Sequence, residues 1–358
     1  MQSDTTKRLT VADIVKFVVF VAIGFFFVYW FLLKLPADQK SAIWQSFRGA
    51  NYLWVAVVMA ACLLSHFVRA LRWRLLYEPL GRQPSLFSTF GAVLVAYLAN
   101  LAFPRLGEVL RCAVLRTSDG IAVDKSLGTV VTERLTDVLL NALIILMGML
   151  FVVSDIREWA SNGLAEKSAS LPALAIAAAV ALALLVAMAL LYRRYRDTLL
   201  RYKLFAKVDK LIMGVLDGVK SIMHLGRRSL VLYMVYSLTI YLLYIVAGYI
   251  IFRAFPETAH LGVSAAFLLY FMGSVGMMFS QGGLGLYPVL VQMALAVYAV
   301  PMVQGLATGW LLWGAQQAVV LAFGLLFMFY FAIAKNLKKD KSGIDNEAER
   351  EEKPENPR

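Results

Sequence analysis

Long apolar runs separated by short polar segments dominate the hydropathy pattern of this chain. They cover residues 14–35, 53–76, 86–103, 127–153, 171–192, 230–252, 263–279, 286–300 and 302–334. Most of these runs reach the length of about 20 apolar residues that a helix needs to cross a bilayer. The first run is too long for a cleaved signal peptide, and no small-residue cleavage site follows it. The pattern therefore predicts an all-α polytopic integral membrane protein.

The distribution of Lys and Arg predicts the orientation of the chain. Basic residues gather after the run at 53–76, in the segment 193–229 and after the run at 302–334, whereas 154–170 and 253–262 are short and nearly charge-balanced. Cytoplasmic loops carry the excess of Lys and Arg in membrane proteins. We therefore expect both termini in the cytoplasm of a bacterial inner (plasma) membrane.

Three regions follow from this orientation. Residues 1–12 form a cytoplasmic N-terminus, residues 13–335 form the membrane domain, and residues 336–358 form a charged cytoplasmic tail. The tail has no apolar period and is expected to be disordered. Within the domain, apolar positions at helical spacing in 193–229 predict an amphipathic helix that lies either on the anionic inner leaflet or against the bundle.

Two runs conflict with this orientation if they cross the membrane completely. A full crossing by 86–103 would place the following basic residues, Arg105, Arg111, Arg116 and Lys125, outside. The conflict disappears if the chain breaks near residues 100–104 and returns to the cytoplasm as a re-entrant hairpin, which is tolerated where protein or a wet cavity surrounds it.

A second break is expected near the C-terminus. The run at 263–279 ends in the glycine-rich segment 280–285 and is followed by a short apolar helix. A re-entrant hairpin from the outside leaves about six full crossings. Two interrupted helices that enter from opposite faces indicate an inverted-repeat transporter with a site at the midplane. The alternative is that both segments are ordinary loops between full spans.

Ionisable residues cluster around the first break. Arg105, Glu108 and Arg111 follow it on one broad face of a helix that is expected to begin at Phe103 or Pro104, so that Glu108 and Arg111 are close enough to pair. Glu133, Arg134 and Asp137 lie about 10–15 Å into the run at 127–153, at a rise of about 1.5 Å per residue. A charge in hydrocarbon costs roughly 2.5–3.5 kcal/mol or more unless it is partnered.

Two interpretations of these residues stay open. In the structural one, Arg105, Arg111 and Arg134 only neutralise the three carboxylates. In the functional one, the group binds an anion or relays protons. The candidate substrate-binding residues are then Asn100, Arg105, Arg111, Arg134, Arg72, Gly282, Gly283 and Gly285, and the residues for charge balance or proton coupling are Glu108, Glu133 and Asp137. Arg69, Arg72 and Arg74 are interpreted mainly as span-end residues that set topology, although Arg72 is also a candidate for admitting anions from the inner leaflet.

Several functional classes are not expected. The net charge of +12 arises from basic residues at span ends, so it does not indicate a nucleic-acid partner. Two cysteines and three scattered histidines show no metal-ligand spacing, and no catalytic motif or P-loop is visible. We therefore expect no metal, no cofactor and no enzymatic activity.

The chain resembles the lysylphosphatidylglycerol synthase transmembrane region, a flippase-like family, over about residues 10–335. The matching motifs are Arg69-x-x-Arg72-Trp73, Asn100-x-x-x-Pro104-Arg105-x-Gly107-Glu108-x-x-Arg111, Glu133-Arg134-x-x-Asp137 and Gly282-Gly283-x-Gly285. The family often has a proline before the glycine pair and an acidic residue after it, where this chain has Gln281 and Tyr287-Pro288. The resemblance implies a stand-alone membrane part and lipid translocation rather than lysyl transfer.

The expected function is translocation or binding of an anionic lipid, such as a phospholipid or a polyprenyl-phosphate-linked intermediate. The phosphate would meet the basic residues and the two half-helix N-termini near the midplane. A homodimer is left open. A small-anion secondary transporter is the first alternative, and an intramembrane lipid-modifying transferase is the second.

Overall fold

The computed structural model describes residues 44–103, 105–163 and 225–351, and every regular element in these ranges is helical. Its long helices are α3 (Tyr52–Leu75), α6 (Val123–Gly163), α9 (Arg227–Ile251) and α12 (Met302–Glu351). Three segments of this part are long and apolar enough to cross a membrane, namely Tyr52–Leu80, Arg227–Ala254 and Met302–Ala334. The predicted runs at 14–35 and 171–192 and most of 193–229 lie outside the described residues.

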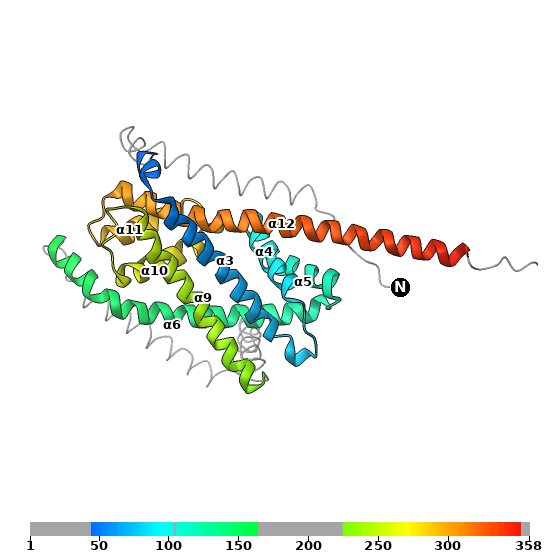
Figure 1. Cartoon of the computed structure of the whole chain (residues 1–358). Coiled ribbons are helices and arrows are strands. Elements are labelled where there is room, and N and C mark those ends of the chain that lie inside the picture. The colour runs from blue at the N-terminus through cyan, green and yellow to red at the C-terminus, as the bar shows by residue number, and fades with distance from the viewer. Residues whose placement is uncertain (1–43, 104, 164–224, 352–358) are drawn as a thin grey trace, which may run out of the picture.

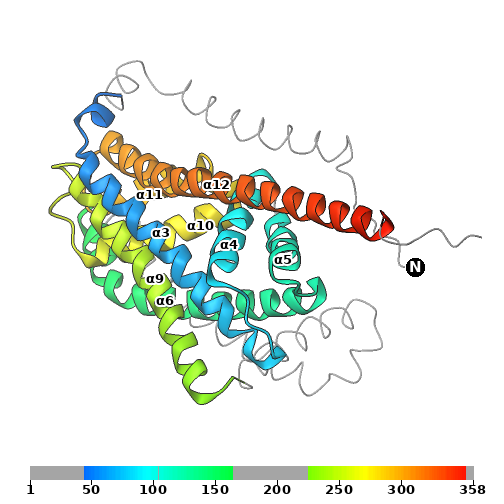
Figure 2. The same ribbon diagram turned by 45° about the vertical axis from the view of Figure 1, so that its right-hand side comes forward.

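Helices α3 and α9 form an antiparallel pair through the middle of the bundle (Figures 1 and 2). The amide of Asn51, the N-cap of α3, donates to the carbonyl of Ala254 at 2.9 Å. Ala254 is the last residue of the short helix η2 (Phe252–Ala254), which directly follows α9. The start of α3 therefore lies beside the end of α9. The opposite end of α3 leads through η1 (Glu78–Leu80) into the next helix.

The first expected break separates α4 (Leu86–Ala102) from α5 (Leu106–Asp119), and the two helices pack against each other as a hairpin. At their base, the amide of Ser85 donates to Asp119 Oδ1 at 3.0 Å. Helix α5 begins at Leu106, so the expected start at Phe103 or Pro104 is wrong. The reason is that Phe103 is extended and Arg105 takes a left-handed conformation with φ 67°.

The second expected break lies between α10 (Val263–Phe279) and α11 (Leu286–Ala296), with the short helix η3 (Gln281–Gly283) at the tip. Gly282, Gly283 and Gly285 all have positive φ angles there, which glycine adopts without steric cost. A Cβ atom at Gly276 of α10 would lie 2.8 Å from the Cα of Tyr287 in α11. The chain therefore reverses tightly into a second hairpin.

The two hairpins occupy opposite ends of α3. The apolar core around α10 and α11 includes Val55 and Val58 from the first half of α3, whereas the core around α4 and α5 includes Ala70 and Trp73 from its second half. The tips of the hairpins meet, because a Cβ atom at Gly282 would lie only 2.9 Å from Cδ2 of Leu101 near the end of α4. The hairpins thus point toward each other along the bundle.

Helices α6 and α12 lie along opposite edges of the bundle in both views (Figures 1 and 2). Helix α6 has 41 residues and reaches from α10 to α5. Helix α12 packs on α11, where a Cβ atom at Gly309 would lie 2.7 Å from the Cα of Pro288. It continues to Glu351, beyond the boundary at residue 335 and into the predicted disordered tail, through a stretch with several Lys and Glu residues, which are good helix formers.

Candidate functional site

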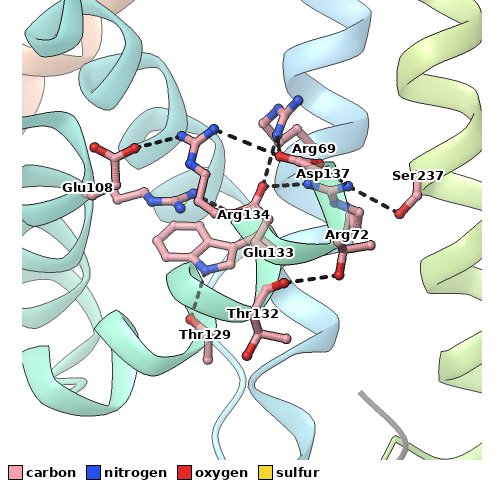
Figure 3. A network of polar contacts seen from close by, with 12 residues as sticks. Arg69, Arg72, Glu108, Thr129, Thr132, Glu133, Arg134, Asp137 and Ser237 are labelled. Carbon is pink, nitrogen blue, oxygen red and sulfur yellow. Dashed lines mark hydrogen bonds and ion pairs between the residues drawn. The ribbon is translucent and has the colours of Figure 1, made fainter. Parts of the chain in front are cut away.

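Seven ionisable side chains from three helices come together beside the α4–α5 hairpin, and we call them the charge cluster (Figure 3). Helix α3 supplies two arginines, α5 supplies one glutamate and one arginine, and α6 supplies the rest. The members are Arg69, Arg72, Glu108, Arg111, Glu133, Arg134 and Asp137. They include four guanidinium groups and three carboxylates, so one positive charge is in excess.

Glu133 lies at the centre of the charge cluster and is fully buried. Its Oε1 is 2.9 Å from Nη2 of Arg72 and 3.2 Å from Nη1 of Arg69, and its Oε2 is 2.6 Å from Nη1 of Arg111. Charged hydrogen bonds of this length are about twice as strong as neutral ones. One carboxylate therefore connects α6 to both α3 and α5.

Asp137, one helical turn after Glu133, repeats the connection to α3. Its two oxygens lie 2.7 Å from Nη1 of Arg69 and 2.7 Å from Nη1 of Arg72. The two arginines lie on one face of α3 at i, i+3, and the two carboxylates lie on one face of α6 at i, i+4, so the two pairs can face each other.

Helix α9 adds neutral partners to the arginines of α3. Arg69 donates to the hydroxyl of Tyr244 at 3.1 Å. Arg72 donates to Oγ of Ser237 at 3.2 Å (Figure 3). The hydroxyl of Tyr241 also donates to the backbone carbonyl of Asp137 at 2.7 Å. Three helices besides α5 therefore hold the buried side of the charge cluster in place.

The outer edge of the charge cluster is an ion pair between Arg134 and Glu108, with Nη2 and Oε1 3.0 Å apart. The Arg134 side chain is 39% exposed and the Glu108 side chain is 22% exposed. The expected pairing of Glu108 with Arg111 on α5 is wrong, because Arg111 turns inward to Glu133 while Glu108 meets α6. Two ion pairs thus attach the α4–α5 hairpin to α6, a buried one through Arg111 and a partly exposed one through Glu108.

The aromatic ring of Trp73 supports the α5 side of the charge cluster. Its Nε1 donates to Oγ1 of Thr129 on α6 at 2.9 Å (Figure 3). The guanidinium carbon of Arg111 lies 4.5 Å from the centroid of the indole, within the range of a cation–π contact. This stacking fixes the plane of the Arg111 guanidinium.

The other predicted site residues lie elsewhere. Arg105 is exposed and forms no ion pair with any residue that the structure describes, so it does not neutralise a carboxylate of the cluster. Asn100 accepts a hydrogen bond through Oδ1 from the amide of Gly107 at 2.8 Å and so closes the α4–α5 hairpin. The predicted glycines lie at the other hairpin tip, where the carbonyl of Gly282 accepts from Trp313 Nε1 at 2.7 Å.

Arg69 is the member of the charge cluster that sequence reasoning missed. The span-end interpretation is wrong for Arg69 and Arg72, because both side chains are at most 5% exposed and paired with carboxylates. The signal in the sequence that identifies both arginines is their spacing. Arg69, Arg72 and Trp73 stand at i, i+3 and i+4 and therefore share one face of α3. Arg74, outside this face, instead donates through Nε to the carbonyl of Pro84 at 2.9 Å.

The fold and the buried charge cluster define a polytopic α-helical membrane protein. The sequence matches the family described as "Lysylphosphatidylglycerol synthase TM region" over residues 14–333, and the chain belongs to this family. No curated protein and no solved structure gave a significant match. The family membership inferred from the sequence motifs is thereby confirmed.

Proposed function

We propose that this protein translocates an anionic lipid, either a phospholipid or a lipid-linked phosphate intermediate, across a bacterial inner membrane. The observation that carries the proposal is the positive excess of the buried charge cluster. Burying one positive charge that no carboxylate compensates is costly, and ionisable groups inside a membrane protein commonly mark a pathway. An anionic headgroup would neutralise this charge.

The two hairpins supply the second support for the proposal. Helices α5 and α11 have 14 and 11 residues, which correspond to lengths of about 21 and 16 Å and fall short of a hydrocarbon core of about 30 Å. Their bases lie at opposite ends of α3 and their tips touch. We therefore propose that both are re-entrant, in a frame of about six crossings with cytoplasmic termini.

The experiment that tests the proposal is a lipid-scrambling assay in proteoliposomes. Purified protein is reconstituted with fluorescent phosphatidylglycerol or fluorescent phosphatidylcholine, and dithionite reports how much lipid changes leaflet. We expect movement of the anionic lipid above that in protein-free vesicles, and less movement of the zwitterionic one. Saturable uptake of labelled inorganic phosphate without lipid movement would instead support the small-anion transporter.

A matched pair of variants on α5 assigns the transport to the charge cluster. Arg111→Lys keeps the charge but loses the planar fork of the guanidinium, whereas Arg116→Lys changes an exposed residue of the same helix. Loss of charge-assisted hydrogen bonds is expected to slow transport by roughly tenfold or more in the first variant. Equal transport rates in the two variants would contradict a role for this site.

A further inference from the structure

The inward-facing guanidinium of Arg111 uses only part of its donor set. Nη1 donates to Glu133, but Nε and Nη2 have no hydrogen-bond partner among the described residues, although the residue is 2% exposed. The N–H bonds of Nε and Nη2 lie side by side on one edge of the guanidinium plane. This edge is a fork that binds two oxygens of a carboxylate or phosphate at once.

Two more buried polar groups lie close to Trp73, the residue on which Arg111 stacks. The hydroxyls of Tyr77 and Ser126 are on residues with 0% exposure, and neither makes a well-formed hydrogen bond of 3.5 Å or less to a described residue. The Tyr77 ring packs against Trp73 with centroids 5.6 Å apart, and Arg111 stacks on the same indole. The Tyr77 hydroxyl lies near Ser126 and Thr129, which can form at most weak hydrogen bonds with it, and it is close enough to Arg111 to interact with its charge.

We call Arg111, Tyr77 and Ser126 the donor pocket, with Trp73 as its wall. Polar atoms that are buried without a good partner are costly to the folded state, so a group of them in one place requires an explanation. The guanidinium can only donate, and the nearest carboxylate, Glu133, already engages the opposite edge of Arg111. The group that would satisfy the free fork is therefore an oxyanion.

We propose that the donor pocket binds a phosphate oxyanion, as a monoester or a diester. A planar carboxylate would use both its oxygens on the fork of Arg111. A tetrahedral phosphate presents further oxygens out of that plane, which the hydroxyls of Tyr77 and Ser126 can reach as donors. The identity of the phosphate as a lipid headgroup rests on the proposed function, whereas the pocket itself does not.

Calorimetry on the detergent-solubilised full chain tests the donor pocket. The probes are inorganic phosphate and dihexanoyl phosphatidic acid, with dihexanoylglycerol as the phosphate-free control. We expect at least one phosphate probe to bind, and Tyr77→Phe and Ser126→Ala each to weaken binding by roughly threefold to tenfold. Binding of both probes indicates that the pocket accepts free phosphate, and binding of the lipid alone indicates a headgroup site.

The control variant is Tyr52→Phe, which removes an exposed hydroxyl that bonds the carbonyl of Phe47. Its phosphate affinity should equal that of the unaltered chain. Because these two hydroxyls make at most weak contacts with each other and with Thr129, neither Tyr77→Phe nor Ser126→Ala should lower the thermal unfolding temperature of the unliganded protein. The proposed pocket would be overturned if Tyr77→Phe and Ser126→Ala both leave the phosphate affinity unchanged. It would also be overturned if they weaken phosphate binding only when they lower the unfolding temperature as well.

The two proposals fail in different ways. If Arg111→Lys abolishes lipid movement while Tyr77→Phe and Ser126→Ala leave phosphate binding unchanged, the pocket is wrong and the translocase stands. If the hydroxyl variants weaken phosphate binding but no lipid moves in the vesicles, the pocket stands and the translocase is wrong.

Discussion

Glu133 contacts three guanidinium groups, and at the residue scale this single carboxylate determines whether the buried arginines are compensated. One of its oxygens contacts both arginines of α3, and the other contacts Arg111 of α5. Asp137 pairs with both arginines of α3 and, more distantly at 3.9 Å, with Arg134. Among the described residues, Glu108 pairs only with the partly exposed Arg134. The three carboxylates are therefore not equivalent.

We expect Glu133→Gln to lower the free energy of unfolding by about 3–5 kcal/mol, since it leaves buried guanidinium groups without their counter-charge. Thermal unfolding in detergent measures the effect. Glu257→Gln serves as the control, because Glu257 is exposed. If both variants unfold at the same temperature, Glu133 does not hold the arginines of α3 and α5 together.

The pairing within the cluster was only partly predictable from sequence. The depth of Glu133 and Asp137 in their run identified them as members, because short acidic side chains cannot reach the membrane surface from there. Arg69 resembles any arginine near the end of a span until α6 is placed beside α3. Arg105 is exposed and has a left-handed backbone, a conformation that non-glycine residues adopt rarely and that residue type does not reveal.

At the element scale, close backbone contact holds each hairpin together. A Cβ atom at Gly107 would collide with the carbonyl oxygen of Ala96 on α4, and Oδ1 of Asn100 would be 2.7 Å away. Glycine at this position lets the first turn of α5 lie directly on α4. The proline and glycine signals in the sequence predicted both breaks, whereas the side-chain contacts that close the hairpins depend on tertiary packing.

Gly107→Ala is expected to lower the free energy of unfolding by about 1–3 kcal/mol, because α5 must move away from α4. The matched substitution is Gly128→Ala in α6, where a Cβ atom meets nothing within 4 Å. There, the better helix propensity of alanine should raise stability by about 0.5–1 kcal/mol. Chemical denaturation in detergent compares the two, and a result of the same sign for both would contradict the close contact.

At the scale of the whole molecule, the hairpins enter the bundle from opposite ends and meet at their tips. The proposed re-entrant topology makes a specific prediction about sidedness. Gln83 precedes α4 and Thr117 lies near the end of α5, whereas Glu257 precedes α10 and Met302 follows α11, and all four are exposed. The first two should face one side of the membrane, and the last two should face the other.

Single cysteines in a background with Cys62→Ala and Cys112→Ala test this sidedness. A membrane-impermeant maleimide added to inside-out vesicles should label Gln83→Cys and Thr117→Cys. The same reagent added to right-side-out vesicles should label Glu257→Cys and Met302→Cys. Labelling of Gln83→Cys and Thr117→Cys from opposite sides would mean that the α4–α5 segment crosses the membrane, as ordinary loops between full spans would require.

The extra guanidinium of the charge cluster has an electrical consequence for the proposed translocase. When a monoanion occupies the site, the loaded form is neutral, so the membrane potential does no work as it reorients. The empty form carries one elementary charge, on which a potential of 100 mV acts with about 2.3 kcal/mol. Voltage would therefore govern the return of the unloaded carrier, and an imposed diffusion potential should change the turnover rate without changing the apparent affinity for the lipid.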